Sequence, residues 1–467
     1  MKKFVYSILL WSVFFTTFAE RRNYFIENTF DEVTEEPITH GTAYRNEIGT
    51  RTYPWNLTFQ EWFNSPYLMP MRRYLLEDKG IVPTISYLGN FAANTSGGRS
   101  QGSAMASNVN IDLGIDFGKL TQSKLLEGLT FGNTWSWRFG NNLSREKIGN
   151  NFTVQQVYGD AVLRCQAMYF GYHTQIDDDW KLHLKLGRIA AADNFLSKPI
   201  YWLYQNNAFD GNPVGIFKQQ KWSAYPTAAW GAFARIEHID GQYFKAGVYQ
   251  INSDKQNSPH EHGFDWSFDG DGVNANFELG WDINHDDSGK SPANISIGLA
   301  ADWYNVPYLS RNAYTDFSYT IYLQADYMVW NLGNPKRQYD KRSYIPRTHD
   351  SYRDLRGLIL WGAIEFNPNS NTAEMPLFIN GGILFNAPFK ERADDVLCFG
   401  VAYGKFSDNL PINDYRRDSY EMLLELNYKF QVNRFFFLQP NIQYIINTNG
   451  GEYPNAVVLG LQFGLNL

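Results

Sequence analysis

This chain has few cysteines, a small net charge and few long apolar runs. Its two cysteines cannot support a disulfide scaffold or a four-ligand zinc site. A formal charge of −7 provides no basic footprint for nucleic acid. Beyond the N-terminal segment no apolar run of about 20 residues remains, which argues against a helical membrane bundle. Phosphate-binding, dinucleotide-binding and His-Glu-x-x-His motifs are also missing, so no cofactor and no metal is expected.

The N-terminus has the plan of a secretory signal peptide. Lys2 and Lys3 precede an apolar run from Phe4 to Phe18, and the small residue Ala19 follows. A charged start, a short hydrophobic stretch and a small-residue exit are typical of such peptides. We therefore predict a cleaved signal peptide over residues 1–19, with an uncleaved anchor as the alternative.

Two further segments come before the region of regular alternation. Residues 20–66 are polar and are predicted to form an extended or flexible arm. In residues 67–80, apolar side chains fall near helical spacing and Gly80 is a suitable stop. A short amphipathic helix is expected there.

From residue 81 to residue 467, apolar and polar residues alternate in one segment after another. Clear examples are 108–117, 272–283, 318–329 and 420–430. Because successive side chains of a strand point to opposite faces, each segment has one apolar face and one polar face. The segments run about 9–12 residues, which is long for a soluble strand and suits a tilted transmembrane strand.

A soluble sandwich would alternate too, but other features favour a membrane barrel. Tryptophans recur near the segment ends, as in interfacial girdles. The polar faces carry charged residues and glycines in the middle of the strands, as expected of a water-filled lumen. A bilayer permits a sheet only if the sheet closes. The predicted fold is therefore all-β: a closed antiparallel transmembrane β-barrel over residues 81–467, with about 16 strands and a short N-terminal helix.

The strand count and the connections are less sharply defined. Sixteen is even, as bacterial barrels require, while fourteen or eighteen are alternatives. Alternation is weakest at 163–173 and 356–366. Long gaps at 191–227, 252–271 and 330–355 are predicted to be extracellular loops, one of which could fold inward and narrow the pore.

Several short motifs follow one another along the chain. The first is Arg73-x-x-Leu76-x-x-x-Gly80-Ile81. The others, in chain order, are Leu186-Gly187-Arg188 with Asp193-Asn194-Phe195, Tyr225-Pro226 with Trp230-Gly231, Gly247-Val248-Tyr249, Leu438 to Tyr444, and Val458 to Leu461. Together they resemble motifs of the carbohydrate-selective porin (OprB) family of outer-membrane barrels, in which the first is similar to the family's entry to strand one. The closing strand ends on apolar Leu467, a weaker form of the terminal signal that assembly machinery reads.

The resemblance implies a sixteen-strand barrel, monomeric or loosely associated into homo-oligomers, in the outer membrane of a Gram-negative-type bacterium. It implies passive diffusion of sugars and other small hydrophilic solutes, with no enzymatic activity. The implied partners are these solutes, outer-membrane lipid and lipopolysaccharide, and the barrel-assembly machinery. A general porin and a barrel-type surface or adhesive protein are the alternatives.

Alternation and the family motifs together select a set of candidate lumen residues. A solvated wall position is the alternative role for each of them. The solute-path candidates are Arg138, Lys185, Arg188, Asp193, Asn194, Arg235, Glu278, Asp302, Tyr322, Asp326 and Glu365. Cations gather in the first half of the strands and carboxylates in the second half, which predicts a field across the pore. Tyr322, Tyr304 and Tyr249 are candidate stacking platforms for sugars.

Other motifs have simpler explanations. Gly98-Arg-Ser-Gln-Gly102 fits the esterase G-x-S-x-G pattern, but a strand follows it where an elbow needs a helix. His260-Glu261-His262 offers at most two metal ligands, and the aspartates at 177–179 and 265–271 match turn chemistry better than a calcium loop. Cys165 and Cys398 are expected on opposite faces, so a disulfide between them is not expected.

Overall fold

The computed structural model describes residues 75, 79–157, 163–252, 267–284, 290–333, 355–392, 394–411, 414–416, 419–432 and 436–466. The predicted signal peptide (1–19), the polar arm (20–66) and all but three residues of the predicted helix (67–80) lie outside these residues. Within the described part, no helix is both long enough and apolar enough to cross a membrane.

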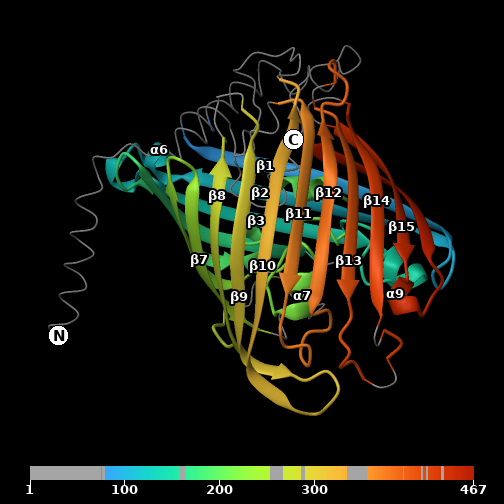
Figure 1. Ribbon diagram of the computed structural model, residues 1–467. Coiled ribbons are helices and arrows are strands. Elements are labelled where there is room, and N and C mark those ends of the chain that lie inside the picture. The colour runs from blue at the N-terminus through green and yellow to red at the C-terminus, as the bar shows by residue number, and fades with distance from the viewer. Residues whose placement is uncertain are drawn as a thin grey trace.

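Sixteen antiparallel strands form one closed barrel, which confirms the predicted fold class (Figure 1). Each strand pairs with its neighbours in the chain, and β1 closes the sheet against β16. The strands are β1 (Ile81–Ser96), β2 (Gly102–Asp116), β3 (Leu129–Gly140), β4 (Leu163–Gln175), β5 (Trp180–Ile189), β6 (Ala229–His238), β7 (Gln242–Ile251), β8 (Gly272–Ile283), β9 (Ala293–Pro307), β10 (Tyr314–Asn331), β11 (Gly357–Phe366), β12 (Leu377–Asn386), β13 (Val396–Lys405), β14 (Tyr420–Gln431), β15 (Phe436–Ile446) and β16 (Ala456–Asn466).

Short helical turns occupy several connections. Each of them lies between two consecutive strands. They are α6 (Phe117–Thr121), η4 (Lys124–Leu126), η5 (Ser144–Ile148), η6 (Ala191–Asp193), η7 (Pro199–Leu203), α7 (Gly215–Gln219) and α9 (Thr448–Gly451).

The two faces of the sheet differ as the alternation predicts. Large apolar side chains such as Leu186, Leu279 and Ile297 are exposed on the outer face. Their strand neighbours, such as Lys185, Glu278 and Ser296, point inward. An apolar exterior around a polar interior is the pattern of a barrel in lipid, and it excludes the soluble sandwich.

The two strands with weak alternation have separate physical causes. In β4 the register against β3 shifts between Thr134 and Trp135, so one bulge reverses the inward and outward positions along the strand. In β11 both faces are apolar, because the inner residues Ile359 and Trp361 pack in a hydrophobic cluster inside the barrel.

Connections alternate between the two ends of this meander. The end where β16 finishes carries the turns at 176–179 and 239–241, and we call it the turn end (Figure 1). The opposite end, the loop end, carries 190–228, the end of β7, the start of β8 and α9. The connection from β10 to β11 starts and ends at the turn end, so the three predicted loops cannot all be on one side of the membrane; residues 334–354 of the loop predicted at 330–355 lie outside the described residues. The strand order places this connection. Consecutive strands of the sheet run in opposite directions, so every connection that follows an even-numbered strand lies at the end where β16 finishes.

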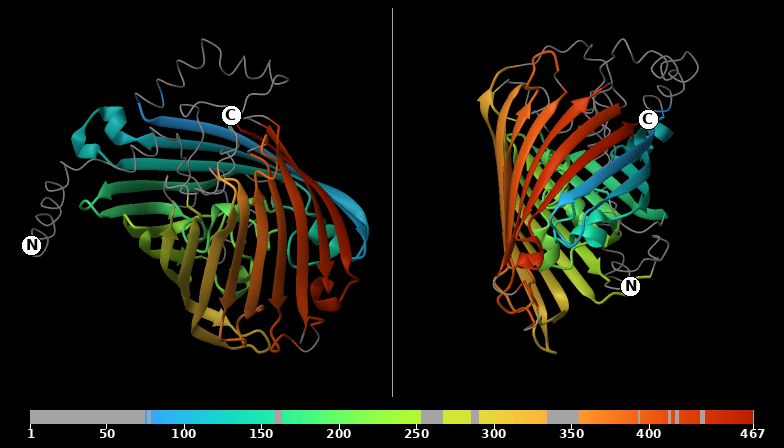
Figure 2. Two further views of the ribbon diagram at one scale, coloured as in Figure 1. Left: turned by 45° about the horizontal axis from the view of Figure 1, so that its top comes forward. Right: turned by 90° about the vertical axis from the view of Figure 1, so that its right-hand side faces the viewer.

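Two loop-end segments fold into the barrel rather than away from it. We call residues 190–228 the inner loop; it lies between the barrel walls in Figure 2, together with residues 141–157. Phe152, Tyr204 and Phe209 from these segments are fully buried in one cluster with inward residues of β11–β14. The barrel therefore has an apolar core inside it, on one side of the lumen.

Inward glycines make room for this core. A Cβ on Gly400 of β13 would lie 2.8 Å from Tyr204, and a Cβ on Gly382 of β12 would lie 2.6 Å from the Tyr204 hydroxyl. The interpretation of mid-strand glycines as a sign of open water is therefore wrong for these two strands. Here the missing side chains receive aromatic rings of the inner loop.

Candidate functional site

The inner loop keeps its own shape by internal hydrogen bonds. Asn212 donates from Nδ2 to the carbonyl oxygens of Ala192, Phe195 and Leu196, at 2.9, 3.2 and 2.9 Å. The Ala191 amide donates to Ser223 Oγ at 3.0 Å, which joins the start of the loop to its return. The loop thus approaches the wall as a folded unit.

Inward carboxylates of the wall hold this unit by accepting its backbone N–H groups. Glu425 accepts from the amides of Gln205 and Asn206, both at 2.9 Å. Asp302 accepts from the Lys221 amide at 2.6 Å. A buried carboxylate needs such partners, because an unpaired charge away from water is costly. These carboxylates therefore serve as anchors of the loop.

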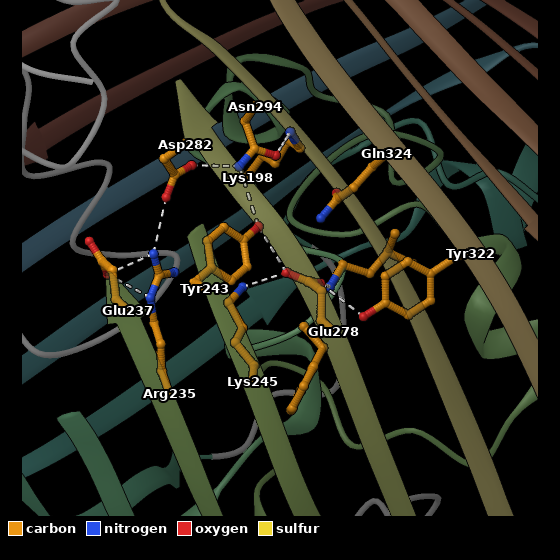
Figure 3. A network of polar contacts seen from close by, with 12 residues as sticks. Lys198, Arg235, Glu237, Tyr243, Lys245, Glu278, Asp282, Asn294, Tyr322 and Gln324 are labelled. Carbon is orange, nitrogen blue, oxygen red and sulfur yellow. Dashed lines mark hydrogen bonds and ion pairs between the residues drawn. The ribbon is translucent and has the colours of Figure 1, made fainter. Parts of the chain in front are cut away.

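Glu278 is the centre of the polar network in Figure 3. Its Oε1 accepts from Lys245 Nζ at 2.7 Å and from the Tyr243 hydroxyl at 3.2 Å. Its Oε2 accepts from the Tyr322 hydroxyl at 2.9 Å and from the Leu196 amide of the inner loop at 3.2 Å. The network thus joins three strands and the loop at one carboxylate.

Arg235 forms the second part of this network, nearer the turn end. Its guanidinium lies 2.8 Å from Glu237 and 3.0 Å from Asp282, and 4.1 Å above the Tyr243 ring (Figure 3). Lys198 of the inner loop pairs with Asp326 of β10. Opposite charges therefore meet within β6, between β6 and β8 across β7, or between loop and wall. The predicted separation into a cationic and an anionic half does not describe this side of the barrel.

A third cluster joins the return of the inner loop to β2 and β3. The Arg138 guanidinium stacks on the Tyr225 ring, 4.1 Å from its centroid. The Tyr225 hydroxyl donates to Asn110 at 3.0 Å, lies 2.8 Å from Ser136 Oγ, and accepts from Asn108 at 2.6 Å. Arg138 therefore supports the loop from the opposite wall.

Most of the predicted site residues are buried from solvent. Those with little exposure are Arg138, Arg188, Asn194, Glu278, Asp302, Tyr322, Asp326 and Glu365. Tyr322 and Tyr249 are fully buried under the inner loop, so neither ring can stack on a sugar, and that prediction is wrong. The reason is that alternation defines the inner side of a strand and cannot show what covers it.

Arg188 departs from the inward series altogether. Along β5 it follows the alternation of Leu184 and Leu186, whose side chains are exposed on the outer face. It is nevertheless buried at the strand end, where Nη2 donates to the Ala228 carbonyl at 3.1 Å. The structure thus places Arg188 at the base of the loop and not in the series that faces the lumen.

Three predicted residues keep partial exposure: Lys185, Asp193 and Arg235. Lys181 and His183, the inward neighbours of Lys185 on β5, are partly exposed as well. Lys185 Nζ donates to Asn194 Oδ1 at 3.1 Å, which brings the inner loop against this strand. The inner side that water reaches therefore includes a strip of β5 and β6 facing the start of the inner loop.

Asp193 faces this strip from the start of the inner loop, in η6, and carries a titrating carboxyl group. Although Asp193 keeps partial exposure, the burial of the rest of its side chain raises the pKa of its carboxyl to about 7, against the opposing effect of the nearby Lys185 ammonium. The charge of the strip therefore changes near neutral pH.

Several residues that organise the site were not among the sequence candidates. Lys198, Asn212 and Tyr225 lie in a region without alternation, so no periodic signal marks them. Tyr225 stands in the motif Tyr225-Pro226 noted above, whereas only the place of Lys198 and Asn212 in an unusually long connection could have drawn attention to them.

No group of three or more metal-ligand side chains occurs within the described ranges. The His260-Glu261-His262 motif lies outside them. Cys165 on β4 and Cys398 on β13 are buried and are not joined in a disulfide. The Ser of the G-x-S-x-G pattern lies in the short turn between β1 and β2, where no helix follows.

A closed sixteen-strand barrel with an apolar exterior, a polar lumen and an inward-folded loop defines a porin of the bacterial outer membrane. The family model of the carbohydrate-selective porins, OprB family, matches residues 100–467. The chain belongs to this family, and it is a sugar-passing outer-membrane porin. This confirms the resemblance seen in the sequence motifs.

Individual relatives agree with this assignment. The putative porin QuiX of Acinetobacter baylyi is 25% identical over 410 residues, which cover 84% of this chain and 91% of that protein. The high-pH structure of Pseudomonas putida OprB superposes with a TM-score of 0.72 at 20% identity, covering 87% of this chain and 97% of that one. The low-pH structure of the same protein gives a TM-score of 0.51 at 16% identity, with 86% and 98% coverage. The structural likeness supports the fold.

Proposed function

We propose that sugars and other small hydrophilic solutes cross the barrel along the strip of β5 and β6 that faces the start of the inner loop. The observation that supports this path is the partial exposure of Lys185, Asp193 and Arg235 in a lumen whose other predicted site residues are covered. Donors and acceptors along the strip match hydroxyl groups, and the loop limits the width. Passage is by diffusion.

The finer features of this role are also part of the proposal. The chain performs no catalysis, is exported by the signal peptide at residues 1–19, and is inserted by the barrel-assembly machinery. It contacts outer-membrane lipid and lipopolysaccharide through its apolar exterior and acts as a monomer or a loose homo-oligomer. The loop end faces the cell exterior, because long loops are extracellular and short turns periplasmic in such barrels.

Liposome swelling with a graded sugar series tests the function directly. We expect faster swelling for monosaccharides than for charged or apolar solutes of similar size, because only hydroxyl-rich solutes can bond to both sides of the path. A heat-denatured sample controls for leakage. Swelling that follows size alone would indicate a general porin. No swelling from β-rich protein would contradict the transport role and favour a surface protein whose function lies in its loops.

Asp193 predicts a pH dependence of ion selectivity. Its carboxyl is neutral below about pH 7 and negative above it, so the preference for anions over cations should fall as the pH rises through about 7. Reversal potentials in a KCl gradient measure this. Asp193→Asn removes the titrating group, and its channel should keep the low-pH selectivity throughout. A wild-type profile that persists in Asp193→Asn would assign the titration to another residue.

A further inference from the structure

A small open cavity lies at the loop end, outside the path described above. Its volume is about 430 Å³, and it is lined by Pro411, Asp414, Tyr415, Arg416 and Asn449. These residues come from the connection between β13 and β14 and from α9. The cavity therefore faces the solution from which solutes enter the barrel.

The cavity combines one exposed aromatic ring with a fixed pair of polar groups. Tyr415 is 73% exposed, far more than the other tyrosines considered above. Arg416 donates from Nε to Asp414 Oδ1 at 3.0 Å and from Nη2 to Oδ2 at 2.7 Å. This fork holds a planar donor beside a planar acceptor, while Asp414 Oδ2 and the second N–H of Arg416 Nη2 can still bond a ligand.

A second carboxylate and a lysine of the inner loop hold the Asp414–Arg416 pair in place. Arg416 also pairs with Glu374, and Glu374 accepts from Lys218 of α7 at 3.2 Å. Burial raises the pKa of Glu374, but the cations of Lys218 and Arg416 outweigh it, so the pKa lies below the usual value. Hydrogen bonds from the Arg416 side chain lower the pKa of Asp414. Both carboxylates are therefore ionised at neutral pH, and the floor of the cavity is tied to the inner loop.

Asn449 completes the wall of the cavity. Its amide oxygen accepts from Asn151 at 2.9 Å, and its backbone N–H donates to Glu421 at 2.8 Å. The cavity is thus supported by both inward-folded segments and by the barrel wall, so its shape is fixed before a ligand arrives.

We propose that this cavity is a capture site for sugars at the outer mouth of the channel. The Tyr415 ring would cover one face of a pyranose, and the Asp414–Arg416 pair would accept from and donate to two adjacent hydroxyl groups. Apolar sugar faces stack on aromatic rings, and vicinal hydroxyls fit a planar carboxylate or guanidinium. The inference rests on the proposed function, since a capture site matters only if sugar then crosses the barrel.

Uptake of radiolabelled D-glucose tests the proposal, in cells whose other porins are deleted and over a wide range of sugar concentration. Tyr415→Ala should lower uptake at low glucose by roughly three- to tenfold, the effect of losing one aromatic contact, and leave uptake at high glucose unchanged. Tyr415→Phe keeps the ring and should keep most of the uptake. Asp414→Asn should also lower uptake at low glucose.

Tyr314→Ala is the matched control, because Tyr314 is another exposed tyrosine at the loop end, 62% exposed, outside the cavity. Its uptake should equal that of the wild type. Equal low-glucose uptake by wild type and Tyr415→Ala, with normal flux at high glucose, would overturn the capture site and leave the porin function standing. No glucose uptake by the wild type at any concentration would overturn the proposed function itself.

Discussion

Replacing Gly400 with leucine should raise the single-channel conductance in KCl by at least about twofold, because a displaced inner loop leaves a wider path for hydrated ions. A Cβ at this position would lie 2.8 Å from the Tyr204 ring and 2.9 Å from the Phe209 ring. Both rings already pack against Trp361, with centroid distances of 5.3 and 5.9 Å. They have no deeper position to occupy, so the loop must leave the wall. Planar-bilayer recordings of the refolded variant measure the change.

Gly362→Leu provides the matched control for Gly400→Leu. Gly362 belongs to β11 on the outward series, and a Cβ there would meet only the Asn380 carbonyl oxygen at 3.5 Å. Its conductance should equal that of the wild type. If Gly400→Leu folds, as judged by heat-modifiable gel migration, and still conducts like the wild type, the inner loop does not limit the channel.

Removing the carboxylate of Glu278 should produce the largest loss of stability among single changes at the site. Glu278→Ala leaves the Lys245 ammonium without the partner that now lies 2.7 Å away, and leaves the Leu196 amide of the inner loop without its acceptor. Breaking a buried ion pair on one side costs about 3–5 kcal/mol. The free energy of unfolding from lipid vesicles in guanidinium chloride should fall by this amount, with tryptophan fluorescence as the signal.

Two further variants separate the ion pair from general damage. The double variant Lys245→Met with Glu278→Gln removes both charges and should recover most of the lost stability, since no unpaired charge remains. Glu237→Gln is the milder control, because Arg235 keeps Asp282 at 3.0 Å. A double variant as unstable as Glu278→Ala would show that packing around the side chain matters more than the charge pair.

The barrel could be predicted from sequence because each strand carries its own signal. In β8 and β10, one side faces lipid and the other faces polar groups, so apolar and polar residues alternate along the strand. The prediction weakened where a strand has a bulge, as in β4, or apolar residues on both faces, as in β11. Both exceptions arise from contacts with other parts of the chain.

The site was less predictable, because its geometry depends on contacts over long sequence distances. Alternation correctly turned Glu278, Asp302 and Asp326 inward, but it could not show that loop residues would cover them. Lys198 meets Asp326 across 128 positions, and Gln205 meets Glu425 across 220. No local pattern in the chain encodes such pairs. Several charged side chains that the sequence alone placed along the lumen are therefore buried in contacts with the inner loop.

The contacts of the inner loop also bear on the order in which the chain assembles. Its partners on β12 and β15 follow it in the chain: Asn380 donates to the Ala208 carbonyl at 2.8 Å, and Gln439 donates to the Leu203 carbonyl at 2.6 Å. We expect such a loop to enter before the seam between β1 and β16 closes. Residues 190–228 would then act as a template for the later hairpins. Changes in this segment should reduce the yield of mature barrels as well as altering the flow through those that form.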